Sequence, residues 1–75
     1  MLSEEEIRKE IKDLNTELNF LESKYAQIEE GIRDDSYPRV IGISDKKRLL
    51  MTAYGVENKL YALHLVLGEE YKFRH

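Results

Sequence analysis

The sequence predicts an all-α fold, an antiparallel hairpin of two long helices, and three observations lead to this prediction. Apolar residues recur with alternating steps of four and three in both halves of the chain. A stretch that contains the single proline separates the two repeats. The halves also differ in charge, since residues 1–35 hold eleven acidic and five basic residues, whereas residues 36–75 hold four and seven. We therefore expect one domain, 1–75, with helices over 3–33 and 44–68 or slightly beyond, and a connection over 34–43.

The first helix has a clear beginning and one apolar face. Ser3 followed by Glu6 is the pattern of a capping box, and the intervening Glu4 and Glu5 place negative charge at the positive end of the helix dipole. A stripe as narrow as the one that follows needs a partner helix along its whole length. The opposite charges of the halves favour a partner from the second half of the chain, in the same chain or in a second copy. The stripe has the spacing of a coiled-coil seam: Ile7, Ile11, Leu14, Leu18, Leu21, Tyr25, Ile28 and Ile32.

The second helix is expected to begin after Ser44, which has a suitable side chain for an N-cap, with Asp45 in the first turn. Gly68 is the expected terminator, although Tyr71 and Phe73 would extend the apolar surface if the helix continued. The partner seam of this helix comprises Leu49, Ala53, Val56, Leu60, Leu63 and Leu67.

The second helix carries more apolar residues than this seam requires. A further stripe of Leu50, Tyr54, Tyr61 and Leu65 lies about 100° around the helix. Because so small a chain cannot bury both stripes, we expect two hairpins to dimerise into a four-helix bundle. Alternatively, the connection and the C-terminal Tyr71 and Phe73 fold back over the stripe. The polar residues between the stripes either bind a polar ligand or fix the register of the bundle, and the predicted interface is Leu50, Tyr54, Glu57, Tyr61, His64 and Leu65.

The connection contains a candidate recognition loop of Tyr37, Pro38 and Arg39, because an exposed aromatic residue beside an arginine is a common binding anchor. The apolar segment 40–43 that follows is expected either to fold over the open end of the bundle or to meet the same segment of another subunit.

Basic residues gather near the expected start of the second helix, where free N–H groups favour anions. They either bind an anion or are neutralised by Glu29, Glu30, Asp34 and Asp35 at the end of the first helix. The candidate anion site is Arg39, Lys46, Lys47 and Arg48.

The sequence contains few residues in patterns that would indicate metal binding, catalysis, nucleic-acid binding or membrane contact. Without cysteine, a zinc site is restricted to His64, His75 and carboxylates, and Glu57 and His64 do not have the spacing of a carboxylate-bridged metal bundle. We therefore expect no catalytic residues, cofactor or metal. The net charge of −3 argues against nucleic-acid binding. The acidic N-terminus and the lack of an apolar run of roughly 18 residues lead us to expect a cytoplasmic protein without membrane contact.

The function that we expect is non-enzymatic protein interaction by a helical homodimer, as a small adaptor, regulator or inhibitor of an unidentified protein partner. A bacterial or viral origin fits this class. In architecture alone, the predicted hairpin is similar to small bacterial and phage regulators that dimerise as four-helix bundles. The alternative is a small bundle that binds an anionic or nucleotide-like ligand at the basic start of the second helix.

Overall fold

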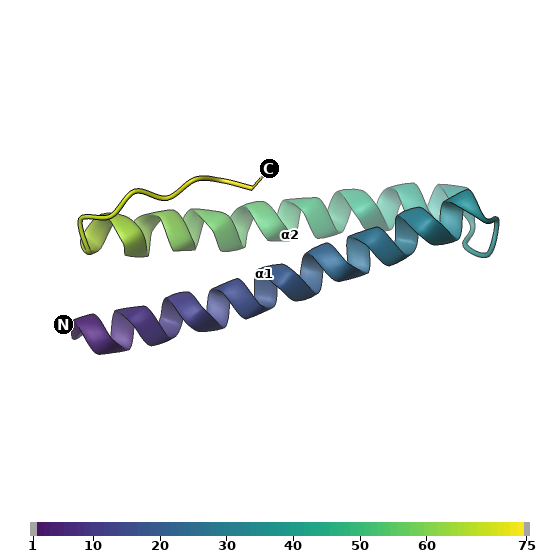
Figure 1. The fold of residues 1–75 in the computed structure, drawn as a ribbon. Helices are drawn as coiled ribbons and strands as arrows, with labels where there is room; N and C mark the ends of the chain where they lie inside the picture. Colours follow the sequence, from purple (N-terminus) through teal and green to yellow (C-terminus); the bar gives the residue numbers. More distant parts are fainter. Residues whose placement is uncertain (1, 75) are drawn as a thin grey trace.

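The computed structural model describes residues 2–74, which form two antiparallel helices and a C-terminal segment that runs back along the second helix (Figure 1). Helix α1 comprises Glu4–Arg33 and helix α2 comprises Arg39–Val66. The molecule is rod-shaped, with extents of 48 × 17 × 15 Å. The expected all-α hairpin is confirmed, and the two helices pair within one chain.

The two helices begin in different ways. At the start of α1 the predicted capping box is present: the Glu6 N–H donates to Ser3 Oγ at 3.2 Å, and the Ser3 N–H donates to Glu6 Oε1 at 3.4 Å. Helix α2 has Pro38 at its N-cap position and no side-chain cap. The expected role of Ser44 as the N-cap is therefore wrong, since Ser44 lies inside α2.

The connection is shorter than expected, because the segment 40–43 belongs to α2. The Gly42 N–H donates to the Pro38 carbonyl oxygen at 2.8 Å and so closes the first turn. Gly42 is buried at a seam position, four residues before Lys46 and seven before Leu49. A glycine has no side chain to continue the apolar repeat. The seam therefore extends about two turns further than the hydrophobic pattern indicates.

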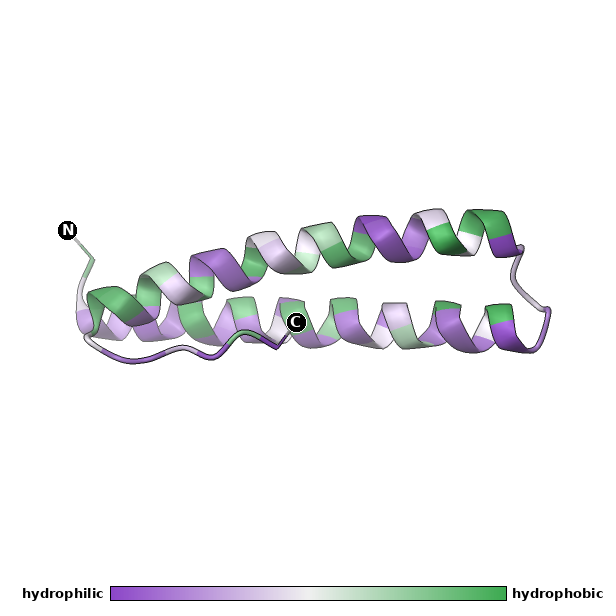
Figure 2. Ribbon diagram, turned by 90° about the horizontal axis from the view of Figure 1, so that it is seen from above, coloured by the Kyte–Doolittle hydropathy of each residue, from purple (hydrophilic) through white to green (hydrophobic). Residues whose placement is uncertain are grey.

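The core lies between the first half of α1 and the middle of α2, and it confirms the predicted seams there. Leu18 and Leu60 are 0% exposed, and apolar residues recur on successive turns of both helices (Figure 2). Seam residues of α1 closer to the connection, such as Leu21 and Tyr25, are half-buried. The buried apolar residues are Ile7, Ile11, Leu14, Leu18, Ala53, Val56 and Leu60.

The helices approach each other closely at the connection, around Tyr37. A Cβ atom on Gly31 would lie 2.8 Å from Tyr37 Cβ, and one on Gly42 would lie 2.7 Å from Cγ1 of Ile32. Neither glycine can carry a larger side chain without displacing a neighbour. Asp35 turns the chain with a φ of 64°, a left-handed conformation that aspartate tolerates better than most residues.

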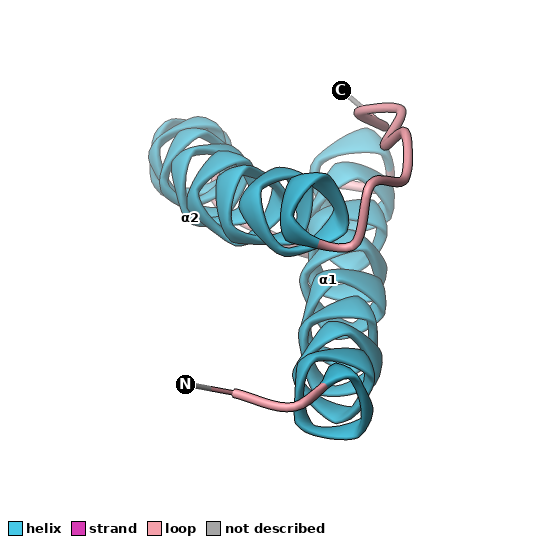
Figure 3. Cartoon of the chain, turned by 90° about the vertical axis from the view of Figure 1, so that its left-hand side faces the viewer, coloured by secondary structure: helices cyan, strands magenta, loops and turns pink. Residues whose placement is uncertain are grey.

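Helix α2 ends in a Schellman motif at the predicted terminator. Gly68 has a φ of 72°, its N–H donates to the Leu65 carbonyl at 3.0 Å, and the Glu69 N–H donates to the His64 carbonyl at 2.8 Å. The chain then reverses direction. Residues 67–74, which we call the strap, lie on one side of the hairpin next to both helices (Figure 3).

Candidate functional site

The strap is held at a buried carboxylate on α2. Glu57 follows the seam residue Val56 and is 0% exposed. Its Oε1 accepts hydrogen bonds from the Tyr71 hydroxyl at 3.0 Å and from the Arg74 N–H at 2.6 Å. Its Oε2 is buried without a hydrogen-bond partner among residues 2–74. One carboxylate oxygen therefore fixes two points of the strap, and the other is an unsatisfied buried acceptor.

Aromatic rings of the strap cover one side of α2. The Tyr71 ring stacks on His64 at a centroid distance of 5.3 Å, and Phe73 lies edge-on to Tyr71 at 5.3 Å and 5.8 Å from Tyr61. Burial and the hydrogen bond to Glu57 raise the pKa of Tyr71 to about 12. The Tyr71 hydroxyl is therefore protonated at neutral pH and available as a donor.

Charged groups at both ends of the strap reach helix α1. Near its start, Glu69 lies 3.1 Å from Arg8 and 3.2 Å from His64, and its hydrogen bonds to these residues lower the pKa of Glu69. Near its end, the Arg74 guanidinium donates to Glu22 at 2.7 Å. Further bonds from Arg74 go to Asn19 at 2.8 Å and Asn15 at 3.4 Å. The strap thus bridges the groove between the two helices.

The six residues of the predicted interface have different surroundings. Tyr54, Tyr61 and Leu65 are exposed, and Leu50 is half-buried. His64 is half-buried beneath Tyr71. Glu57 is buried inside the chain and is not part of an exposed surface. The alternative expectation, in which the connection and the C-terminal aromatic residues fold back over the stripe, is met only in part. Tyr71 and Phe73 contact this side of α2, whereas the connection lies at the far end of the hairpin (Figure 1).

The exposed apolar surface of α2 is longer than the predicted stripe. Val40 is 82% exposed, and Ile43 and Met51 are also exposed. At 100° per residue these three side chains lie on the same side of α2 as Tyr54 and Leu65. Val40 and Ile43 are absent from the predicted stripe because the sequence pattern places them in the connection, whereas they belong to α2. Their helical spacing from Leu50 and Tyr54 was the available signal.

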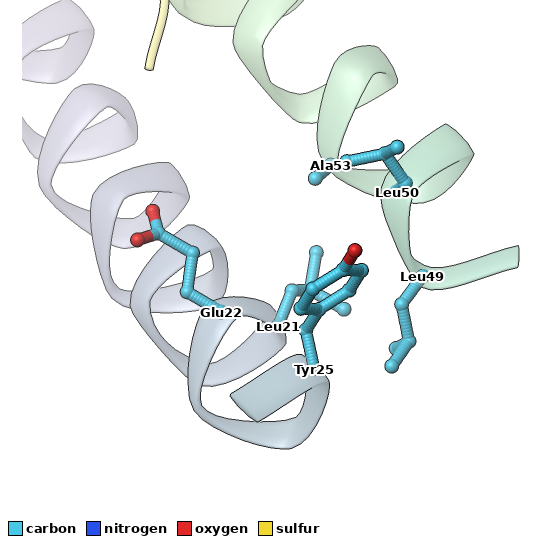
Figure 4. A pocket seen from close by; sticks show the side chains of 6 residues that line it. All are labelled: Leu21, Glu22, Tyr25, Leu49, Leu50 and Ala53. Atoms are coloured by element: carbon cyan, nitrogen blue, oxygen red, sulfur yellow. The ribbon is translucent and has the colours of Figure 1, made fainter. Parts of the chain in front are cut away.

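An apolar cleft of about 220 Å³ adjoins the stripe between the two helices. In Figure 4, Leu21 and Tyr25 of α1 face Leu49, Leu50 and Ala53 of α2 across this cleft. Leu50 belongs both to the cleft and to the stripe. The apolar surface is therefore continuous from the outer side of α2 into the groove beyond the strap.

The expectation of an exposed recognition loop is wrong for Tyr37. This side chain is half-buried, packs beside Gly31 and Gly42, and donates a hydrogen bond from its hydroxyl to Asp45 at 2.5 Å. That hydrogen bond raises the pKa of Tyr37. Pro38 and Arg39 are exposed, but they are the N-cap and the first residue of α2. Tyr37 therefore acts as a packing element at the closed end of the hairpin.

The candidate anion site is also changed by the earlier start of α2. Arg39 is in the first turn, but Lys46, Lys47 and Arg48 lie about two turns inside the helix, away from its free N–H groups. Lys46 Nζ lies 3.5 Å from Glu29 and 5.2 Å from the ring centre of Tyr25. Neutralisation by the end of α1, the alternative to anion binding, is thus found at Lys46.

Within the described chain, no group of three or more histidine, cysteine, aspartate or glutamate side chains is placed to hold a metal ion. His75 lies outside the described residues. Neither α1 nor α2 combines the length and the apolar character that a bilayer crossing requires. No family model, curated protein or solved structure matches this chain.

Proposed function

We propose that this chain is a non-enzymatic protein-interaction module that works as a homodimer, with the α2 stripe of one copy packed against that of the other in a four-helix bundle. The observation that supports the proposal is the apolar surface that α1 leaves uncovered. Leu65 is 62% exposed, and exposed apolar residues continue along α2 as far as Val40. Burial of such surface contributes about 25 cal/mol per Å². A second copy supplies a surface of the same kind.

The spacing of the stripe favours a second copy as the partner. Leu50 and Tyr54 are four residues apart, as are Tyr61 and Leu65. The order and spacing of leucine and tyrosine in the stripe are therefore the same from either end of the helix. Two antiparallel α2 helices related by a twofold axis near Asn58 place Leu50 opposite Leu65 and Tyr54 opposite Tyr61 at both ends. Each leucine then meets a leucine, and each tyrosine meets a tyrosine.

The charges favour the same antiparallel arrangement. It brings the exposed Lys47, at one end of the stripe, toward Glu70, which is exposed just beyond the end of α2 in the second copy. A parallel arrangement would instead align the basic residues 46–48 of both copies, and like charges in register are unfavourable. Such a dimer leaves the outer face of α1 open to a further protein, which fits an adaptor or regulator.

Sedimentation of matched surface variants tests the proposed dimer. Leu65→Lys places a charge in the stripe, whereas Val66→Lys places one on the adjacent residue, which is 70% exposed but points to another side of α2. We expect Leu65→Lys to weaken dimerisation at least tenfold and Val66→Lys to leave it within about twofold. A wild-type chain that stays monomeric up to millimolar concentration, or equal effects of both variants, contradicts the proposal.

Disulfide trapping distinguishes the orientation of the helices, because the sequence contains no cysteine. A single cysteine at Asn58→Cys lies close to the proposed twofold axis and is expected to cross-link two antiparallel chains. A single cysteine at Leu65→Cys lies about 20 Å from its symmetry mate in this arrangement and is expected not to cross-link. A parallel dimer places each residue beside its own symmetry mate, so cross-linking at both positions indicates a parallel dimer.

A further inference from the structure

The strap contacts the same side of α2 that the proposed dimer uses. Phe73 lies against Tyr61, which belongs to the stripe. Tyr71 covers His64, and the strap hydrogen bonds close over Glu57. Half of the six residues predicted as an interface are therefore in contact with the protein's own C-terminal segment.

The strap also fills the groove into which a second hairpin would have to pack. Its residues bind α2 through Glu57 and α1 through Glu22 and Arg8, so it lies between the helices on that side. In a four-helix bundle the second pair of helices packs against this groove and buries it. The strap and the second copy cannot both occupy the groove beside Tyr61.

The strap has the features of a segment that detaches locally while the two helices stay folded. Residues 69–74 contain neither helix nor strand, and Phe73 is exposed although it packs on Tyr61. Most of the contacts between the strap and the two helices are polar, and both of its hydrogen bonds to Glu57 end on a single oxygen of that side chain. Burial of Glu57 Oε2 without a hydrogen-bond partner is energetically unfavourable, and closure of the strap gives this oxygen no donor. Segments with few buried apolar contacts open well below the global unfolding free energy.

We infer that the strap is a displaceable cover that competes with the second copy for the groove beside Tyr61, and so sets the concentration at which the chain dimerises. This inference rests on the proposed homodimer. Each of the two chains has to release its own strap before it dimerises. The association constant of the dimer therefore falls with the square of the ratio of chains with a closed strap to chains with an open strap. A tenfold loss in that ratio therefore strengthens dimerisation by up to about a hundredfold.

The test compares two variants of the full chain by sedimentation. In Tyr71→Phe/Arg74→Ala the strap loses its hydroxyl bond to Glu57 and the bonds of the Arg74 side chain to α1, and neither residue belongs to the stripe. Lys72→Ala, in the same segment, changes an exposed residue and is the control. We expect the double variant to dimerise at least tenfold more tightly than wild type, and Lys72→Ala to match wild type within about twofold. Equal or weaker dimerisation of the double variant overturns the inference.

Hydrogen exchange reports on the strap directly in the wild-type chain. The Arg74 amide is bonded to Glu57, and its exchange is expected to become faster as rising concentration populates the dimer. Protection that is constant or that increases with concentration would mean that the strap remains in place in the dimer, and the inference fails.

The two proposals can fail separately. If Leu65→Lys breaks a wild-type dimer that strap loosening does not strengthen, only the inference about the strap is wrong. If wild type and the strap variant both remain monomeric up to millimolar concentration, the proposed homodimer is wrong, and the inference fails with it.

Discussion

The two helices have nearly the same length, 30 and 28 residues, but they use their apolar residues differently. In α1 the apolar residues lie mainly on one face, with Phe20 as an exposed exception, and α2 covers most of that face. In α2 they lie on several sides, and only one side faces α1. A helix that is apolar around most of its circumference requires more than one neighbour. We therefore propose α2 as the binding element of this chain, with α1 covering one of its sides.

The strongest test of this difference uses two leucines of the same helix. Leu60→Ala removes a side chain that is 0% exposed and is expected to cost about 2 to 5 kcal/mol of unfolding free energy. Leu65→Ala, on the exposed side, is expected to change the stability of the monomer by less than about 0.5 kcal/mol. Urea denaturation at low protein concentration measures both values. Similar losses at both positions would mean that α1 does not define a single covered face.

Substitutions of one glycine in each helix test how closely the chain is packed around them. Gly31→Ala forces a Cβ atom to within 2.8 Å of Tyr37 Cβ, which belongs to the backbone-anchored part of that side chain. We expect a loss of about 1 to 3 kcal/mol. Gly55→Ala, in α2 with no atom within 4 Å, is the control and is expected to stabilise the chain by about 0.5 to 1 kcal/mol. Thermal unfolding should therefore shift in opposite directions, and a shift of the same sign contradicts the tight contact at the connection.

The helix starts provide a smaller contrast. Ser3→Ala removes the only side-chain cap of the two helices and is expected to cost about 1 kcal/mol. Ser44→Ala, at the position where a cap was expected, changes a residue inside α2 and should cost nothing measurable by denaturation. If Ser44→Ala is the more harmful change, α2 begins later in solution.

The smallest effect concerns the strap. Tyr71→Phe removes one hydrogen bond to Glu57 and is expected to cost about 0.5 to 1 kcal/mol at neutral pH. The pKa of Tyr71 is raised from 10.0 to about 12, so the contribution of its hydroxyl is complete below pH 10 and is lost as the pH rises through about 12. The stability difference between wild type and Tyr71→Phe should vanish over that interval. A tyrosinate absorbance step near pH 12 should be absent from the variant.

The sequence was sufficient to predict the hairpin, because the seam from Ile7 to Leu18 and its partner from Ala53 to Leu60 keep a regular apolar period. It was insufficient at Gly42, because this seam position carries no side chain and the nearby Pro38 favours a connection longer than the one found. Tyr37 was misplaced for a related reason: its contacts depend on two glycines from different helices.

The strap could not be predicted with the same certainty. Its folding back was one of two alternatives, because no local periodicity places residues 69–74. Tyr71 and Arg74 are positioned by Glu57, 14 and 17 residues earlier, and by α1, more than 50 residues earlier. Contacts of that separation depend on where the helices lie, which only the folded chain specifies.

The cluster at the connection has a consequence for the order of folding. Gly31, Tyr37 and Gly42 meet within twelve consecutive residues, so this contact closes a short loop at little entropic cost. The contacts of Arg74 with Asn15 and Glu22 join distant parts of the chain and require both helices to be in place. We therefore expect the hairpin to form from the connection toward its open end, with the strap docking last. The nascent chain would then expose its entire apolar α2 surface before its own C-terminal segment arrives.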